Sequence, residues 1–263
     1  MNTNASITSQ RPVLRTGLTF AAASVILAAA ATASADLVVF DNMSNYQGGN
    51  TNARIASTGS TPNTFMGQGY VLTPGTTVIT GFDLYPVNLS GANFTSIKLN
   101  IFVWGGVNTG TVNASTPAFS SLLGSYSFTD TGAYNTGFFY PQEGTPVGSA
   151  PGVVLGSPLA ISSTTIGLSF NYQGSTDGVT YNSANSLTSL IAYGMPASVG
   201  SQVFNGYYRN AASEVDGNFV STLRSLGQTD QSLGLRVYTI PEPSIFALAG
   251  LASVGLLVFR RRN

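Results

Sequence analysis

Apolar and polar residues alternate with a period of two along much of this chain, and that pattern limits its fold more than any other feature. The alternation is clearest over residues 97–104, 122–128, 166–172 and 233–238, and weaker over 37–40, 69–72, 78–85, 153–155 and 189–193. Successive side chains of a β-strand point to opposite faces, so each run predicts a strand. Clusters of Gly, Pro, Asn, Asp and Ser between the runs predict turns. Residues 36–240 are therefore expected to form an all-β domain, an antiparallel β-sandwich of jelly-roll type.

The alternation also predicts which residues share a face. The apolar residues of the run 97–103 are expected to face the core. In the run 122–128, Leu122, Tyr126 and Phe128 are expected on one face, with Gly124 between them.

Residues 1–35 have the features of a secretory signal peptide. Arg11 and Arg15 form a positive flank, residues 18–31 are almost all apolar, and Ala33 and Ala35 form the A-x-A pattern at which signal peptidase cleaves. The alternative is a membrane anchor that is not cleaved. The apolar run is short for a membrane span and ends in small residues, which favours cleavage after Ala35.

Residues 241–263 contain three parts in a fixed order. Pro241, Glu242 and Pro243 come first, followed by the apolar run 244–259 and by three arginines at 260–262. The two prolines oppose helix and sheet pairing, so this short piece is expected to stay extended and accessible. As a helix the apolar run would reach about 24 Å at ~1.5 Å per residue, which is short of the ~30 Å hydrocarbon core. A single hydrophobic helix that enters the membrane is expected, with the arginines on the cytoplasmic side.

This arrangement resembles the PEP-CTERM sorting signal of Gram-negative bacteria that make exopolysaccharide. The resemblance implies that Pro241, Glu242 and Pro243 are recognised by a membrane-embedded exosortase, which removes the tail. It also implies a membrane-anchored intermediate at the inner membrane, followed by the cell surface or the extracellular matrix. Residues 40–42, 80–82 and 235–238 of the body resemble pieces of PEP-CTERM ectodomains as well. A plain tail anchor with proline residues is the alternative.

Several residue types are scarce or missing, which excludes whole classes of function. The chain has no histidine and no cysteine. Ser-His-Asp triads, histidine general bases, thiol catalysis and metal sites built on either residue are therefore excluded. Between residues 36 and 240, five basic side chains stand against nine acidic ones. This negative balance opposes binding to nucleic acid. No motif in the chain indicates a cofactor, so none is expected.

A carboxylate pair is the one candidate for catalysis. Glu214 and Asp216 are two residues apart, so in a strand their side chains would share a face, as the paired acids of a glycosidase must. Asp216 precedes Gly217, however, and Asp-Gly favours a solvated turn.

Two further Asp-Gly segments could offer oxygens to calcium. These are residues 177–178 and 130–132, and neither has the spacing of a calcium-binding loop. Plain turns are the favoured interpretation, and no metal site is assigned.

Two groups of aromatic residues are candidates for binding a glycan. Trp104, the sole tryptophan, shares a strand face with Phe102, and Tyr207, Tyr208 and Arg209 form a second cluster. Sugar rings stack on exposed aromatic faces, and Arg and Asn donate hydrogen bonds to sugar hydroxyls. Burial of all three aromatic rings is the alternative, and the usual burial of aromatic side chains favours it.

These observations favour a non-enzymatic exported protein that associates with exopolysaccharide or mediates adhesion after its tail is processed. A polysaccharide-active enzyme working through Glu214 or Asp216 and a purely structural coat protein are the alternatives.

Overall fold

The protein is described by a computed structural model. It describes residues 36–44, 63–137, 152–181, 186–189, 191–192, 196–211, 219–220, 223 and 232–240. The chain divides into two compact units, Met1–Ala35 and Asp36–Asn263, and every described residue belongs to the second. The predicted signal peptide and C-terminal hydrophobic helix lie outside the described residues.

The described residues form strands and no helix. Their bounds are β1 (Leu37–Asp41), β2 (Asn63–Val71), β3 (Val78–Leu84), β4 (Pro86–Val87), β5 (Phe94–Val107), β6 (Phe119–Tyr134), β7 (Val153–Ala160), β8 (Thr165–Ser175), β9 (Ser186–Ser189), β10 (Ile191–Ala192), β11 (Ser201–Gln202), β12 (Tyr208–Ala211), β13 (Ser232–Leu233) and β14 (Leu235–Thr239).

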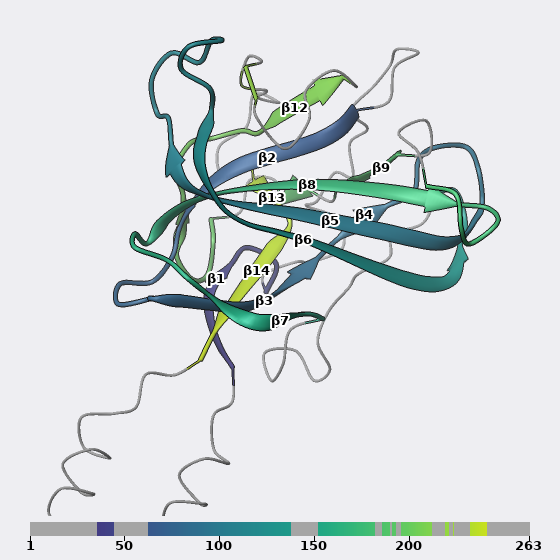
Figure 1. Ribbon diagram of the computed structural model, residues 1–263, viewed down its shortest axis with the longest axis horizontal. Coiled ribbons are helices and arrows are strands. Elements are labelled where there is room, and N and C mark those ends of the chain that lie inside the picture. The colour runs from purple at the N-terminus through teal and green to yellow at the C-terminus, as the bar shows by residue number, and fades with distance from the viewer. Residues whose placement is uncertain are drawn as a thin grey trace, which may run out of the picture. The chain divides into compact units, whose positions relative to one another are not determined.

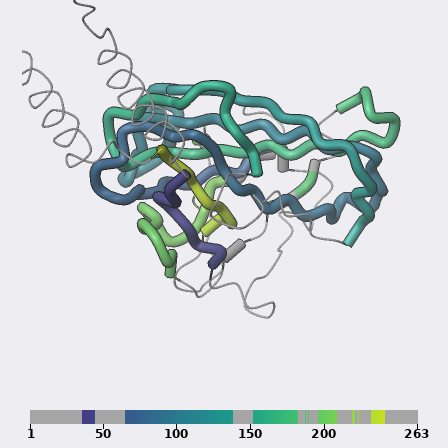
Figure 2. The backbone as a smooth tube through the Cα atoms, turned by 90° about the horizontal axis from the view of Figure 1, so that it is seen from below, coloured from purple at the N-terminus to yellow at the C-terminus, as the bar shows by residue number. Residues whose placement is uncertain are grey.

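Most strands belong to two antiparallel sheets (Figure 1). The small sheet has the order β1-β14-β3-β7, so the last strand of the described chain lies between β1 and β3. The large sheet has the order β11-β2-β8-β5-β6, with β12 also pairing with β2 and β9 with β8. Strands β10 and β13 pair separately. Figure 2 shows β1 in purple and β14 in yellow side by side below the long strands of the large sheet.

One apolar core joins the two sheets. Phe82 and Val237 of the small sheet belong to the same buried cluster as Leu99, Ile101 and Phe170 of the large sheet. This packing stabilises the domain because each sheet buries one apolar face against the other. The prediction of an all-β antiparallel architecture is thus confirmed for the described residues, and the jelly-roll connectivity stays a prediction.

Strand β5 follows its predicted alternation. Its odd-numbered apolar residues are buried in the shared core: Ile97, Leu99, Ile101 and Val103. Phe102 and Trp104 point to the other face and pack in a separate cluster. The large sheet therefore has a core face and an outer face, and Trp104 lies on the outer one, as expected.

The face predicted for Leu122 is wrong. Val103 pairs with Gly124, but the next residue, Trp104, pairs with Leu122, so β6 contains one extra residue, Leu123. This β-bulge moves Leu122 to the outer face, where it is 47% exposed, whereas Tyr126 pairs with the core residue Ile101. Tyr126 and Phe128 do share the core side, and Leu123 packs there with them.

Candidate functional site

The C-terminal strand β14 ends where the predicted processing segment begins. Leu37 pairs with Thr239 and Leu235 with Leu84, so β14 is hydrogen-bonded along both edges. Every residue of β14 is buried, and Ile240, directly after it, is 40% exposed. The sheet therefore holds the chain up to Thr239, and residues beyond 240 emerge from a fixed point.

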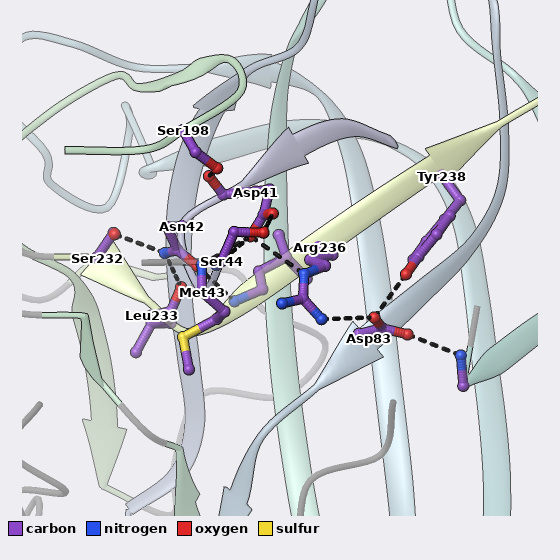
Figure 3. A network of polar contacts seen from close by, with 12 residues as sticks. Asp41, Asn42, Met43, Ser44, Asp83, Ser198, Ser232, Leu233, Arg236 and Tyr238 are labelled. Carbon is purple, nitrogen blue, oxygen red and sulfur yellow. Dashed lines mark hydrogen bonds and ion pairs between the residues drawn. The ribbon is translucent and has the colours of Figure 1, made fainter. Parts of the chain in front are cut away.

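A buried charge cluster crosses the small sheet at Arg236 (Figure 3). Arg236 Nε lies 3.2 Å from Asp41 Oδ1, and Arg236 Nη1 lies 3.3 Å from Asp83 Oδ2. The arginine thus contacts a carboxylate on each neighbouring strand, β1 and β3. Two carboxylates with one guanidinium leave a net negative charge inside the domain, which requires further hydrogen-bond donors.

Those donors are present around both carboxylates. Asp83 accepts hydrogen bonds from the Tyr238 hydroxyl at 2.6 Å and from the Gly152 amide at 2.8 Å. Asp41 accepts bonds from the amides of Met43 and Ser44 at 2.7 Å and 3.0 Å. The Ser44 hydroxyl also donates to Asp41 Oδ2. Both acids are therefore committed to internal partners, and the cluster fixes β14 between its neighbours.

Asn42 extends this polar cluster to β13, the short strand that precedes β14. Its amide nitrogen donates to Ser232 Oγ at 2.6 Å and to the Leu233 carbonyl at 2.7 Å. Its side-chain oxygen accepts a bond from the Leu235 amide at 2.8 Å. Both the nitrogen and the oxygen of the Asn42 side-chain amide are thus bonded to the segment 232–235, and these bonds attach the start of β14 to the end of β1.

The predicted aromatic residues are covered by other side chains. Trp104 is 7% exposed, Tyr207 3% and Tyr208 4%. The Trp104 indole donates to Ser169 Oγ at 3.1 Å, so its polar edge is also occupied. This is the burial that the sequence favoured. Arg209 lies in β12 opposite Met66, and its side chain lies outside the described part of the structure.

Glycines on the outer face explain why these rings can lie against the sheet. A Cβ on Gly167 would lie 2.4 Å from Phe119 Cδ1, and a Cβ on Gly67 would lie 2.6 Å from Phe119 Cε2. Phe119 occupies the space that a side chain would take and meets Tyr208 edge-on, with ring centroids 6.0 Å apart. The sequence pattern missed this cluster because the signal is carried by glycines in separate strands.

The two candidate calcium segments differ from each other. Asp177 starts a turn in which its carboxylate accepts bonds from the amides of Val179 and Thr180 and from the hydroxyls of Ser175 and Thr180. These bonds, the Thr180 amide first, hold the pKa of the Asp177 carboxyl well below its ordinary value. The turn predicted at 177–178 is confirmed.

The turn predicted at residues 130–132 is wrong, because this segment lies within strand β6. Asp130 Oδ2 accepts a bond from the Tyr134 hydroxyl at 2.5 Å. No group of three acidic residues able to hold a metal ion occurs among the residues that the structure describes.

The remaining candidate residues lie outside the part of the chain that the structure describes. They are Ala33, Ala35, Glu214, Asp216, Pro241, Glu242 and Pro243. Within the described ranges no helix is long and apolar enough to cross a membrane.

Comparison with known proteins identifies the segment that β14 leads into. No curated protein and no solved structure matches the chain. The family model described as the PEP-CTERM protein-sorting motif matches residues 239–262, which begin at the last residue of β14. The motif indicates an exported protein that is held at the membrane and then processed by an exosortase. The chain is therefore a carrier of a PEP-CTERM sorting motif, attached directly to an inner strand of the small sheet.

Proposed function

We propose that this protein is a non-enzymatic surface or extracellular-matrix protein that associates with exopolysaccharide after its tail has been processed. The sorting motif supports the route, through a membrane-anchored intermediate to the cell surface. The observation that carries the binding role is the chemistry of the outer face of the large sheet, beside the buried aromatic cluster.

Three cross-strand rows on this face form what we call the polar band. Strands β6, β5 and β8 contribute one residue each to every row: Ser125–Phe102–Ser169, Ser127–Asn100–Asn171 and Thr129–Lys98–Gln173. The β6 members are exposed, the β5 members are half-buried, and Ser169 and Asn171 are buried.

The groups of the polar band match the hydrogen-bonding needs of a polysaccharide. Asn100 donates to Asn171 Oδ1 at 3.0 Å, which orients the two amide groups in neighbouring strands. Hydroxyls and amides both donate and accept, as sugar hydroxyls do. Phe102 packs on Phe65 with ring centroids 5.6 Å apart and offers an apolar edge beside them. Lys98 adds a positive charge that would attract acidic sugar units.

Binding of the host's own exopolysaccharide tests this role. We expect the purified chain to co-sediment with the polysaccharide. The Ser127→Glu variant should co-sediment less, because glutamate adds bulk and negative charge to the polar band. Ser157→Glu is the matched control, since Ser157 is an exposed strand serine in the small sheet. Equal retention of both variants would remove the polar band from the binding site, and no retention of the unaltered chain would remove the polysaccharide role.

Processing is tested separately in the host. Replacement of Pro241, Glu242 and Pro243 by alanine is expected to leave the tail attached, as measured by mass spectrometry of the intact protein. Unchanged tail removal in this variant would contradict the assignment of the processing segment.

A further inference from the structure

The first and last described residues of the domain lie side by side. Leu37 is opposite Thr239 in the antiparallel pair of β1 and β14, so residues 36 and 240 leave the small sheet at the same end. We call this the exit end. In Figure 1 the purple start of β1 and the yellow end of β14 lie together at one end of the small sheet. Asp36 is held there by a bond from Thr80 Oγ1 at 3.1 Å.

Two loops complete the exit end. The Thr239 hydroxyl donates to the Val78 carbonyl at 2.7 Å, which places the start of β3 there. The Ile161 amide donates to the Thr77 carbonyl at 2.9 Å, so the loop before β3 and the loop after β7 lie together. Residues 72–77 and 161–164 contain no charged side chain and are rich in threonine and serine. Their hydroxyls can exchange hydrogen bonds with lipid headgroups, and the absence of acidic side chains avoids repulsion from anionic lipids.

Exposed apolar side chains also gather at this end. Leu37 is 54% exposed and Ile240 40% exposed. Val154, which is 60% exposed, lies opposite Gly81, and Gly81 lies opposite Tyr238, one residue before Thr239. Leu37 and Val154 lie on the two edge strands of this sheet, with the end of β14 between them, so exposed apolar side chains stand on both sides of the chain exit.

The length of the connection to the tail limits how far the exit end can be from a bilayer. The apolar run of the sorting motif begins at residue 244, four residues after Ile240. Four fully extended residues span at most about 14 Å. The headgroup region on one side of a bilayer is roughly 5–8 Å thick. With the tail in the membrane, the exit end must therefore lie within about 6–9 Å of the outer limit of the headgroup region.

We propose that the exit end is the membrane-facing end of the domain and that Leu37, Val154 and Ile240 contact the lipid headgroup region while the tail is inserted. The proposal rests on the membrane-anchored intermediate of the proposed function. It assigns an orientation, because β8 (Thr165–Ser175) begins beside the exit-end loop and extends away from the exit end in Figure 1. The charged Asp177 turn then lies away from the membrane. Removal of the tail leaves only a few exposed apolar side chains as lipid contacts, which are too weak to retain the domain.

Site-specific fluorescence on the full chain tests this orientation. The chain has no cysteine, so a single introduced cysteine carries the only label. Ala160→Cys places a bimane label at the exit end without touching the tail, since Ala160 is exposed and pairs with Val78. Val179→Cys is the matched control in the Asp177 turn, with Val179 80% exposed. Both variants are reconstituted into vesicles of phosphatidylethanolamine and phosphatidylglycerol that contain a lipid with a spin-labelled headgroup.

We expect severalfold stronger quenching by the spin-labelled lipid at position 160 than at position 179, and the reverse order with aqueous iodide. Adding Leu37→Asp and Val154→Asp should lower the lipid quenching at position 160. Co-flotation with equal lipid quenching at the two positions would overturn the orientation and leave the anchored intermediate standing. Failure of the chain to float with the vesicles would overturn both.

Discussion

Arg236 and Asp83 form a buried ion pair between β14 and β3, with Nη1 and Oδ2 3.3 Å apart. Arg236 also contacts Asp41 in β1, so one side chain joins three adjacent strands. The order β1-β14-β3 means that β1 and β3 have no direct pairing and are connected through β14. The strand that carries the sorting motif is therefore also the strand that completes the small sheet.

Replacing Arg236 by methionine should destabilise the domain strongly. The change leaves Asp41 and Asp83 buried without a cation, and loss of one partner from a buried ion pair typically costs about 3–5 kcal/mol. Urea unfolding followed by Trp104 fluorescence measures the loss. Lys98→Met is the control, because it removes a positive charge from a half-buried surface position.

A triple variant separates charge from packing in this cluster. Arg236→Met combined with Asp41→Asn and Asp83→Asn removes the uncompensated charges and should recover part of the lost stability. If Arg236→Met lowers the free energy of unfolding by no more than Lys98→Met does, the cluster does not stabilise the small sheet.

Gly167→Ala should destabilise the domain through the outer-face aromatic cluster. The added methyl group would lie 2.4 Å from Phe119 Cδ1, so the ring would have to move, and overpacking of this kind costs about 1–3 kcal/mol. Gly156→Ala is the matched control, because its Cβ would meet nothing within 4 Å. Chemical denaturation midpoints compare the two variants, and equal midpoints would contradict the close packing of Phe119 on Gly167.

The alternation of residues predicted where the strands lie but not all of their irregularities. Each predicted run coincides with one or more strands, because alternation directly reflects burial of one face. Strands β4 and β11 have two residues each, too short for any periodic signal. The bulge at Leu123 follows from pairing with β5, and alternation within β6 alone contains no information on it.

The buried charge cluster at Arg236 could not be predicted from the sequence, for a different reason. Arg236 and Asp83 are separated by 153 residues, and only the strand order brings them together. An arginine within an apolar run was the one available sign, since a buried charge requires a partner. The burial of Trp104 likewise depends on Phe119 and on glycines of other strands. The local alternation therefore predicts the sheet face on which Trp104 lies, but not the side chains that cover it.

The Asp177 turn should stay intact at unusually low pH. The bonds from Thr180, Ser175 and Val179 favour the ionised carboxylate and depress its pKa in the folded protein below the ordinary value of 3.8. A depressed pKa contributes stability that is present above the unfolded value and is lost as the pH falls through the folded one. Carboxyl carbon chemical shifts in an NMR titration should show that Asp177 remains ionised as the pH falls below the ordinary value of 3.8. Titration of Asp177 near 3.8 would contradict the hydrogen bonds of the turn.

Ser169→Ala should destabilise the protein and alter the environment of its only tryptophan. The Trp104 indole N–H donates to Ser169 Oγ at 3.1 Å in a buried setting, and an unsatisfied buried donor costs about 1–3 kcal/mol. Ser125→Ala is the control, because Ser125 belongs to the same cross-strand row and is exposed on β6.

In the unaltered chain, Trp104 emission should be blue-shifted and poorly quenched by iodide, since its ring is covered and stacks on Phe119 with centroids 6.5 Å apart. Binding of polysaccharide to the polar band should leave that emission almost unchanged, because the ring is shielded from solvent before and after binding. A strong change in emission on addition of polysaccharide would instead indicate that Trp104 is uncovered to contact the sugar.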